Sequence, residues 1–306
     1  MSTANRTLRI GSRASSLAQW QTRAVQDALQ RAWPELKTEV VHITTRGDRE
    51  LDRALPDIGG KGLFTLEIED ALRTQKIDLA VHSLKDLPTE KPEGLKLGAI
   101  PLREDARDVL ISSEGKSLED LPAGSVIGTS SPRRRAQILL LRPDLQVRSI
   151  RGNVETRVRK VTEGEFDGAV LAAAGLLRLG MKDYISHWFS IEEIMPAPGQ
   201  GAIAVQQREQ DDEVERWLAA IEKPEIRNPV EAERSFLNRL ESGCSAPVGA
   251  WAESDGTQIS MRTLVAREDG QPPIRLEGRG NDPLKLGHQL AEQALDLGAA
   301  EIIGVR

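Results

Sequence analysis

The sequence predicts an α/β protein built from two α/β domains with hinge crossovers between them, followed by a small α+β domain. Its 306 residues allow two or three domains at roughly 150 residues each. Strand-like and helix-like segments alternate through the first hundred residues, and the alternation then restarts near residue 125. After residue 223 the pattern changes, because several strand-like runs precede a final helix.

The first run of alternating elements predicts a mostly parallel sheet with helices on both faces. Helical spacing of apolar residues predicts helices over 15–31 and 63–72. In the second of these helices, Phe64, Ile68 and Leu72 share one face. The strands are expected at residues 7–10, 40–43, 79–81, 97–100 and 109–111.

The second run repeats this pattern in a second α/β domain. Its strands are expected at 125–128, 145–148 and 168–171, and its helices at 132–141 and 154–161. Two proline-containing stretches, 101–105 and 195–201, are predicted to join the two domains, after which a strand at 202–205 returns to the first domain. Two crossings between the same pair of domains predict a hinge beside a cleft.

The last part of the chain reads as an α+β domain. Asn228-Pro229-Val230-Glu231 predicts a helix start, with a cap, a proline at the first helical position and a glutamate at the third. The remaining elements are strands at 248–252, 259–265 and 274–278, a hairpin turn at Asp255-Gly256 and a helix over 284–297. The domain ranges expected from these patterns are 1–101 with 202–219, then 106–195, then 224–306.

Composition excludes several classes of protein. A single cysteine cannot form an internal disulfide and favours a reducing compartment. The N-terminus has no apolar signal core, and the longest apolar stretch, 168–177, is too short to cross a bilayer, so a soluble cytoplasmic protein is expected. The isolated histidines and lone cysteine predict no metal site. Gly59-Gly60-Lys61-Gly62 lacks the spacing of a phosphate loop and is more typical of a flexible lid.

The charge is unevenly distributed along the chain. Residues 131–160 hold nine basic and two acidic residues, a local charge of +7, so the rest of this chain of net charge −6 carries −13. Arg133 and Arg134 follow Thr129-Ser130-Ser131 at one strand-to-helix junction, and Arg157 follows Arg151-Gly152-Asn153 at the next. Helix starts and arginine forks both bind anions, so we expect a ligand with several carboxylates or phosphates. The alternative is a solvated basic face.

Two further segments have side chains that could carry chemistry. Cys244 lies in a loop flanked by glycine and proline, where it could act as nucleophile, covalent anchor or simply a small buried thiol. No histidine lies nearby in the sequence to activate it. Lys85 and Asp86 follow a buried-type strand, so Asp86 could be a general acid or base and Lys85 an anion clamp. The alternative is an ordinary surface ion pair.

Together these segments resemble the porphobilinogen deaminase (hydroxymethylbilane synthase) family over nearly the whole chain. The resemblance is carried by Ile10–Arg13, Thr45–Asp48, Gly59–Phe64, Ala80–Asp86, Gly128–Ser131 with Arg133-Arg134, Arg151–Asn153, Pro198–Gly201 and the Gly243-Cys244 loop. It implies two domains like those of periplasmic binding proteins, with a small third domain. It also implies a monomeric transferase of tetrapyrrole, porphyrin and heme biosynthesis, which joins four porphobilinogen molecules head to tail and releases ammonia and hydroxymethylbilane.

The resemblance further implies a dipyrromethane cofactor, attached to the sulfur of Cys244, that primes the growing chain. Asp86 then corresponds to the catalytic aspartate. The cofactor-binding residues would be Ser83, Lys85, Asp86, Thr129, Ser130, Ser131, Arg133, Arg134, Arg151, Gly152 and Cys244 itself. The substrate-binding residues would be Arg13, Ser15, Lys61, Phe64, Arg157, Arg178 and Gln200. Each pyrrole unit brings two carboxylates, which explains a need for many arginines.

Two other functions compete with this one. A non-enzymatic protein could capture a polyanionic small molecule between two α/β lobes, although the Cys244 loop and the lack of a signal segment argue against it. A nucleic-acid binder could use the arginines, but the acidic remainder and an aromatic content of 3% argue against that. The expected partners are therefore porphobilinogen and the growing polypyrrole, with no nucleic acid and no membrane.

Overall fold

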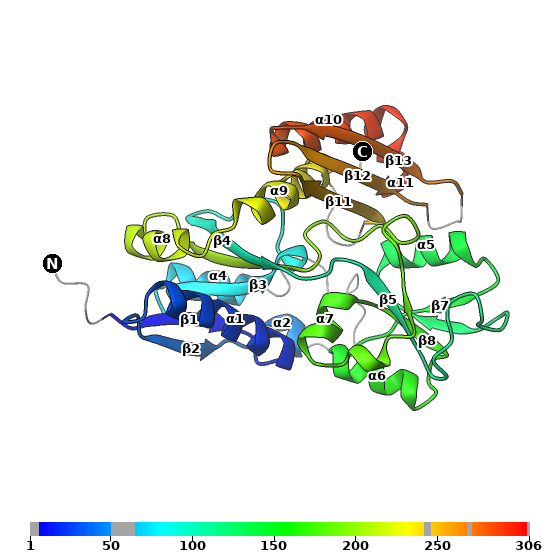
Figure 1. Ribbon diagram of the computed structural model, residues 1–306, viewed down its shortest axis with the longest axis horizontal. Helices are drawn as coiled ribbons and strands as arrows, with labels where there is room; N and C mark the ends of the chain where they lie inside the picture. The colour runs from blue at the N-terminus through cyan, green and yellow to red at the C-terminus, as the bar shows by residue number, and fades with distance from the viewer. Residues whose placement is uncertain (1–5, 50–64, 242–245, 268–270, 305–306) are drawn as a thin grey trace. The chain divides into compact units, whose positions relative to one another are not determined.

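The computed structural model describes residues 6–49, 65–241, 246–267 and 271–304 (Figure 1). Its contacts divide the chain into two compact units, the first comprising Met1–Glu104 with Ala202–Arg227 and the second Asp105–Gly201 with Asn228–Arg306. The chain passes from the first unit to the second after Glu104 and returns at Ala202. The predicted hinge crossovers are therefore confirmed, whereas the three expected domain ranges stay a prediction.

The first unit contains a five-stranded sheet in the order β2-β1-β3-β10-β4. Strand β1 pairs in parallel with β2 and β3, whereas β10 runs antiparallel to both β3 and β4. Four strands therefore point the same way, as predicted, and the one reversed strand is the one that returns from the second unit. The strands are β1 (Leu8–Ser12), β2 (Thr38–His42), β3 (Leu79–Ser83), β4 (Leu95–Arg103) and β10 (Ala202–Arg208).

Helices cover both faces of this first sheet. One face packs against α1 and α8 through buried residues that include Ile10, Val25 and Trp217. The other face packs against α4 through Ile68 and Leu72. The helical elements of this unit are α1 (Ser16–Ala32), α2 (Arg46–Arg49), α4 (Leu66–Arg73), the 3-10 turn η1 (Leu84–Asp86) and α8 (Asp212–Ala219).

The second unit contains a sheet with the same arrangement, in the order β7-β6-β8-β5-β9. Strand β6 pairs in parallel with β7 and β8, and β5 runs antiparallel to β8 and β9. Here too the reversed strand, β5, is the one that has just arrived from the other unit. The strands are β5 (Asp108–Ser112), β6 (Val126–Gly128), β7 (Gln146–Arg148), β8 (Gly168–Ala172) and β9 (His187–Trp188).

Side-chain caps mark the starts of the two longer helices of this second sheet. The helix predicted over 132–141 is α5 (Pro132–Leu141), which has proline in its first turn and Ser131 as its N-cap. The others are α6 (Val154–Thr162), α7 (Ala173–Arg178) and the 3-10 turn η2 (Lys182–Tyr184). The predicted pair of α/β sheets is confirmed.

The C-terminal part of the second unit is the predicted α+β structure. Strands β11 (Val248–Ser254), β12 (Ile259–Val265) and β13 (Ile274–Gly280) form an antiparallel sheet. The turn at Asp255-Gly256 is confirmed, since Gly256 has a φ of 95° and the Asp255 carboxylate accepts the N–H groups of Thr257 and Gln258. Helices α9 (Pro224–Arg239), α10 (Pro283–Asp296) and α11 (Ala299–Ile303) complete it.

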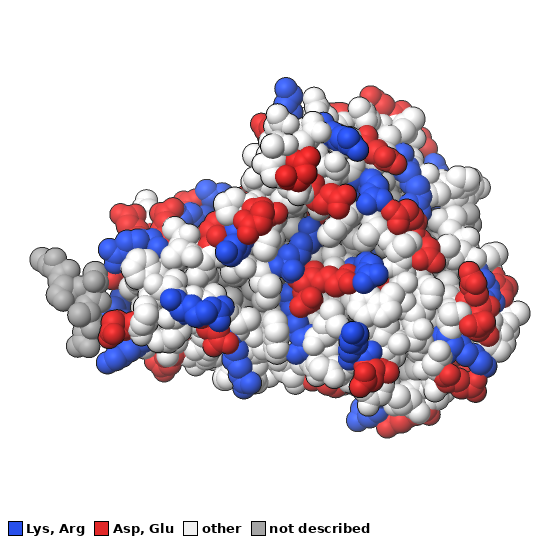
Figure 2. Space-filling view, in the orientation of Figure 1, with Lys and Arg blue, Asp and Glu red and all other residues white. Residues whose placement is uncertain are grey.

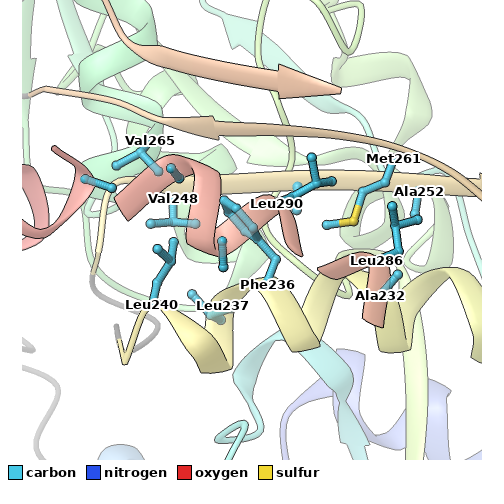
Figure 3. Close-up of a cluster of buried hydrophobic side chains, with 14 of the residues drawn as sticks. Ala232, Phe236, Leu237, Leu240, Val248, Ala252, Met261, Val265, Leu286 and Leu290 are labelled. Carbon is cyan, nitrogen blue, oxygen red and sulfur yellow. The ribbon is translucent and has the colours of Figure 1, made fainter. Parts of the chain in front are cut away.

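The core of this C-terminal part lies between the sheet and two helices. Figure 3 shows Phe236 from α9, Met261 from β12 and Leu290 from α10 in one buried cluster. The two helices approach so closely that a Cβ at Gly287 would lie 2.2 Å from the carbonyl oxygen of Ala232. Glycine is therefore required at this position of α10.

The predicted start of the helix at Asn228-Pro229 is wrong. Helix α9 begins at Pro224, and Pro229 lies inside it. Pro224 takes the first helical position, and the Lys223 carbonyl accepts the N–H groups of Ile226 and Arg227. Pro229 has no N–H to donate, so the helix continues past it with one backbone hydrogen bond fewer. The short helix α11 was not predicted.

His82 in β3 is one of several buried polar side chains in the first unit. The residue is 7% exposed, and its Nε2 has no hydrogen-bond partner within the described ranges. The pKa of His82 is lowered to about 4, chiefly by burial and also by the charge of Arg13, while a hydrogen bond with Gln206 opposes the shift. His82 is therefore neutral at physiological pH.

This burial predicts a pH dependence of the stability of the first unit. Below the ordinary histidine pKa the unfolded chain binds a proton that folded His82 rejects, so stability falls as the pH drops from about 6.5 towards 4. At pH 5 the loss is about 2 kcal/mol relative to pH 8. The free energy of unfolding, measured with urea, should therefore fall less between pH 8 and pH 5 in His82→Gln than in the wild type, and the difference should equal that loss. The exposed His288 on α10 provides the control. If the unfolding free energy of His82→Gln depended on pH as strongly as that of His288→Gln, the prediction would be contradicted.

Candidate functional site

The residues singled out in the sequence are divided between the two units, and each set is described within its own unit. The first unit holds Arg13, Ser15, Ser83, Lys85 and Asp86. The second unit holds Thr129, Ser130, Ser131, Arg133, Arg134, Arg151, Gly152, Arg157, Arg178 and Gln200. Lys61, Phe64 and Cys244 lie outside the described residues.

Asp86 lies at the carboxyl end of a buried strand in the first unit. Strand β3 ends at Ser83 and continues into η1, where Leu84 is fully buried and the Leu87 N–H donates to its carbonyl. This anchored turn leaves Asp86 exposed and Lys85 half-buried. Among the described residues, Asp86 makes no hydrogen bond or ion pair, so its carboxylate remains available to a ligand. The expected alternative, a Lys85–Asp86 surface pair, is absent from this part of the chain.

Arg13 and Ser15 lie between β1 and α1. Ser15 is the N-cap of α1, and its hydroxyl accepts the Ala18 N–H at 3.4 Å. Arg13 is half-buried, and its charge contributes to lowering the pKa of His82. Arg13 directly follows β1, which pairs in parallel with β3, the strand that leads to Asp86.

In the second unit, three hydroxyls order the junction between β6 and α5. Ser131 caps α5 by accepting the Arg134 N–H at 3.4 Å, and Thr129 accepts the Ser131 N–H at 3.2 Å. Ser130 donates to the carbonyl of Ile150 at 2.8 Å. The first turn of α5 is thus fixed at a position where backbone N–H groups favour an anion.

Arg133 and Arg134 are buried and share one carboxylate, that of Asp108. Their side chains are 3% and 8% exposed, and that of Asp108 is inaccessible. Arg133 Nη1 lies 2.7 Å from Asp108 Oδ2, and Arg134 Nη2 lies 2.7 Å from Asp108 Oδ1. We call Asp108, Arg133 and Arg134 the arginine cluster. These two arginines do not belong to a solvated basic face.

The crossover segment also contributes to this arrangement. The buried amide of Gln200 donates to Asp108 Oδ1 at 2.9 Å and to the Ala106 carbonyl at 2.6 Å. Burial alone would raise the pKa of Asp108, but the charges of Arg133 and Arg134, and their hydrogen bonds, hold it well below its ordinary value. The sequence reasoning missed Asp108. Its one signal is an acidic residue at the start of the otherwise apolar stretch that forms β5.

The second junction, between β7 and α6, is built on a left-handed glycine. Gly152 has a φ of 110°, and a Cβ there would lie 2.5 Å from Thr156 Cγ2. Asn153 caps α6 by accepting the Thr156 N–H at 2.8 Å, and Arg157 donates to the Gly152 carbonyl at 2.9 Å. Arg151 is half-buried and makes no hydrogen bond or ion pair with any residue that the structure describes. Its guanidinium is therefore available to an external anion.

Arg178 lies at the end of α7 and is buried. Its Nη2 donates to the Gly201 carbonyl at 2.5 Å, so it contacts the second crossover between the units. Arg178 therefore contacts Gly201, the residue that follows Gln200 in the chain.

The remaining basic residues of the +7 segment have structural partners. Arg142 pairs with Asp144 and donates to the carbonyls of Leu118 and Leu121. The others contact residues of the same unit, namely Arg135 with Val147, Arg148 with Phe166, Arg159 with Glu163 and Lys160 with Glu165. On the face shown in Figure 2, basic and acidic side chains are interspersed. The predicted arginine lining is therefore smaller than the charge count suggested.

The described residues lack the features of two other kinds of site. No group of three or more histidine, cysteine, aspartate or glutamate side chains is placed there to hold a metal ion. Within the same ranges, no helix has both the length and the apolarity needed to cross a membrane.

Two family models match the chain. One, described as porphobilinogen deaminase, dipyromethane cofactor binding domain, matches residues 8–216. The other, described as porphobilinogen deaminase, C-terminal domain, matches residues 228–296. Together they span both units.

Curated relatives match at full length. A porphobilinogen deaminase of Alkaliphilus metalliredigens is 50% identical over 300 residues, covering 97% of this chain and 95% of that protein. One from Brevibacillus brevis is 47% identical over 296 residues and covers 96% of each. Among solved structures, a YaeC-family lipoprotein of Enterococcus faecalis matches with a TM-score of 0.45 and 14% identity, covering 72% of this chain and 93% of that one. By its matches at full length, the chain belongs to the porphobilinogen deaminase family.

Proposed function

We propose that the chain is a transferase that deaminates four porphobilinogen molecules and joins them head to tail on a covalent dipyrromethane primer, releasing ammonia and hydroxymethylbilane. The observation that carries this proposal is the carboxylate of Asp86, which is exposed at the end of a buried strand with no partner in the described part of the chain. A protein that only binds polyanions has no use for an unpaired carboxylate at its ligand site, so the competing binding-protein function is not favoured.

The residues of the second unit fit the dipyrromethane group. The arginine cluster holds two guanidinium groups and one carboxylate out of water, so it carries a surplus positive charge that a ligand carboxylate would balance. Arg151 adds a further guanidinium, one without an ion pair in the part of the chain that the structure describes. When bound, the group supplies the pyrrole carbon to which the first substrate is joined. The residues proposed to hold it are Ser83, Lys85, Asp86, Thr129, Ser130, Ser131, Arg133, Arg134, Arg151, Gly152 and, through its sulfur, Cys244.

Asp86 is the proposed catalytic residue. The substrate loses its amino group as ammonia, and the broken carbon–nitrogen bond leaves positive charge on the pyrrole and its methylene carbon. A carboxylate close to the pyrrole N–H stabilises this charge by a charge-assisted hydrogen bond. After the new carbon–carbon bond forms, the same carboxylate can accept the proton that the ring must lose.

The remaining proposed contacts bind and orient the substrate. Arg13 and Arg157 would pair with substrate carboxylates, since both are half-buried cations beside strand ends. Arg178 is buried and bonds the Gly201 carbonyl of the crossover, and the buried Gln200 of that crossover bonds the Ala106 carbonyl, so any contact with substrate would come from a side chain already held in place. Ser15, Lys61 and Phe64 complete the proposed set.

Several broader statements are proposed with the function. The family membership supports a monomeric protein that acts in the cytoplasm on porphobilinogen and the growing polypyrrole, without nucleic acid or membrane. The three domain ranges 1–101 with 202–219, 106–195 and 224–306 belong to the same proposal.

The covalent primer predicts a mass difference. Protein made in cells that produce porphobilinogen should exceed its sequence mass by one dipyrromethane unit, because the Cys244 sulfur carries it. Cys244→Ser should have the bare sequence mass, which intact-protein mass spectrometry measures directly. A bare mass for the unaltered chain, or an unchanged increment in Cys244→Ser, would contradict the attachment.

The role of Asp86 predicts a loss of turnover without loss of primer. Asp86→Asn removes the charge that stabilises the cationic substrate, so kcat for ammonia release should fall by about 100-fold or more. Asp70→Asn, on an exposed aspartate of α4 in the same unit, is the matched control and should keep normal turnover. If Asp86→Asn retained the primer mass and turned over like Asp70→Asn, Asp86 would have no catalytic role.

The unpaired state of Arg151 predicts a binding defect that its neighbours do not share. Arg151→Gln removes a charge-assisted contact to a carboxylate. The KM for porphobilinogen should therefore rise, or the primer content fall, by roughly 10- to 100-fold. Arg159→Gln lies on the adjacent helix and removes an exposed arginine 3.9 Å from Glu163, so both quantities should stay within about twofold. Equal effects of the two substitutions would refute a specific role for Arg151.

A further inference from the structure

The arginine cluster has more positive than negative charge, and its hydrogen bonds determine which guanidinium donors remain unbonded. Two permanently charged guanidinium groups, whose side chains are 3% and 8% exposed, meet one carboxylate that is inaccessible to solvent. All three residues lie in the second unit, and Arg133 and Arg134 occupy the first turn of α5 while Asp108 begins β5. Asp108 therefore bonds residues that are 25 and 26 positions away in the sequence.

The two carboxylate oxygens of Asp108 accept hydrogen bonds from different donors. Oδ2 accepts Arg133 Nη1 at 2.7 Å. Oδ1 accepts Arg134 Nε at 3.1 Å, Arg134 Nη2 at 2.7 Å and Gln200 Nε2 at 2.9 Å. Because both oxygens are committed, the carboxylate fixes the planes of both guanidinium groups as well as neutralising one of them.

Arg133 is held by one end and leaves the other end unbonded. Its Nη1 contacts Asp108 and the Met195 carbonyl, the latter at 2.5 Å, whereas its Nε and Nη2 have no partner among the residues the structure describes. Arg134 differs, because Asp108 takes its Nε and Nη2, and Nη1 donates to the Val170 carbonyl at 3.1 Å. The donors that remain for a ligand therefore lie on Arg133.

The backbone that carries Arg133 is also fixed. Gln137, one turn further along α5, donates to the Met195 carbonyl at 3.1 Å and accepts the Met195 N–H at 2.7 Å. The Ser131 cap fixes the start of the same helix. With both backbone anchors in place, the remaining freedom of Arg133 is that of its long side chain, which Asp108 removes.

We propose that Asp108 is a positioning residue, which holds Arg133 and Arg134 so that Nε and Nη2 of Arg133 meet a carboxylate of the primer and thereby orient the end of the primer that receives porphobilinogen. The inference rests on the proposed function and adds a residue that touches the arginines and not the ligand. Ordering an arginine side chain costs conformational entropy, and because Asp108 holds the side chain, that cost arises during folding and not during binding.

Positioning and simple neutralisation predict opposite results for Asp108→Asn. If Asp108 only neutralised charge, its loss would leave two uncompensated guanidinium groups and strengthen anion binding, so the KM for porphobilinogen would fall. If Asp108 positions the arginines, their geometry is lost and the KM rises. The direction of the change in KM therefore separates the two roles.

The experiment compares the holoenzyme forms of the wild type, Asp108→Asn and a matched control. Asp78→Asn is the control because Asp78 is also buried, at 1% exposed, and is bonded by Arg6, Arg9 and Arg208 outside the candidate site. We expect Asp108→Asn to raise the KM about tenfold or more, and Asp78→Asn to lower the melting temperature with a KM within about twofold of wild type. An unchanged or lowered KM in Asp108→Asn overturns the proposal.

A second variant covers the case in which Asp108→Asn does not fold. Asp108→Glu keeps the charge and moves the carboxylate by one methylene, so positioning predicts a raised KM and neutralisation predicts an unchanged one. A wild-type KM in Asp108→Glu overturns the proposal. Failure of the proposed function is distinguishable, because the wild-type protein itself would then release no ammonia from porphobilinogen.

Discussion

The buried contact between Asp108 and two arginines is the constraint on which the second unit depends. A guanidinium group removed from water without a partner costs several kcal/mol, so these three side chains must be brought together for the unit to fold. Asp108 comes from the first strand after one crossover, the arginines come from the helix that follows β6, and Gln200 comes from the next crossover. The same contact therefore fixes where the chain enters and leaves the unit and where its cationic site lies.

A second buried aspartate shows how a purely structural cluster differs from this one. Asp78 in the first unit receives Arg6, Arg9 and Arg208, but Asp211 and Glu213 also take part, so three arginines meet three acids. Although burial opposes ionisation, hydrogen bonds from Arg9 and Arg6 hold the pKa of Asp78 below its ordinary value. This cluster is balanced without a ligand, whereas the cluster at Asp108 has two cations and one anion. Charge balance thus separates a structural group from a binding group of similar composition.

The sequence predicted those features that local signals determine. The bounds of α5 follow from Ser131 and Pro132, and both strand-to-helix junctions were found because caps and glycines mark them. The same reliance on local signals explains the error at α9, where Asn228-Pro229 imitates a helix start four residues inside a helix that begins at another proline. Asp108 could not be found in this way, because its partners are distant in sequence. Nor could the charge count show that Arg142 and Arg148 have structural partners while Arg151 has none among the described residues.

Each unit holds a candidate site group whose charge the described residues do not balance, a carboxylate in the first unit and guanidinium groups in the second. In the first unit the exposed carboxylate of Asp86 follows a strand anchored by the buried Leu84. In the second unit the surplus is positive, at Arg133 and Arg151. The guanidinium groups of the second unit favour an anionic group on the ligand, and the carboxylate of Asp86 favours a cationic one. Porphobilinogen provides both, since it has two carboxylates and an aminomethyl group that leaves positive charge behind on the pyrrole. The pattern of unbalanced charges therefore favours a reacting substrate over a polyanion that is simply stored.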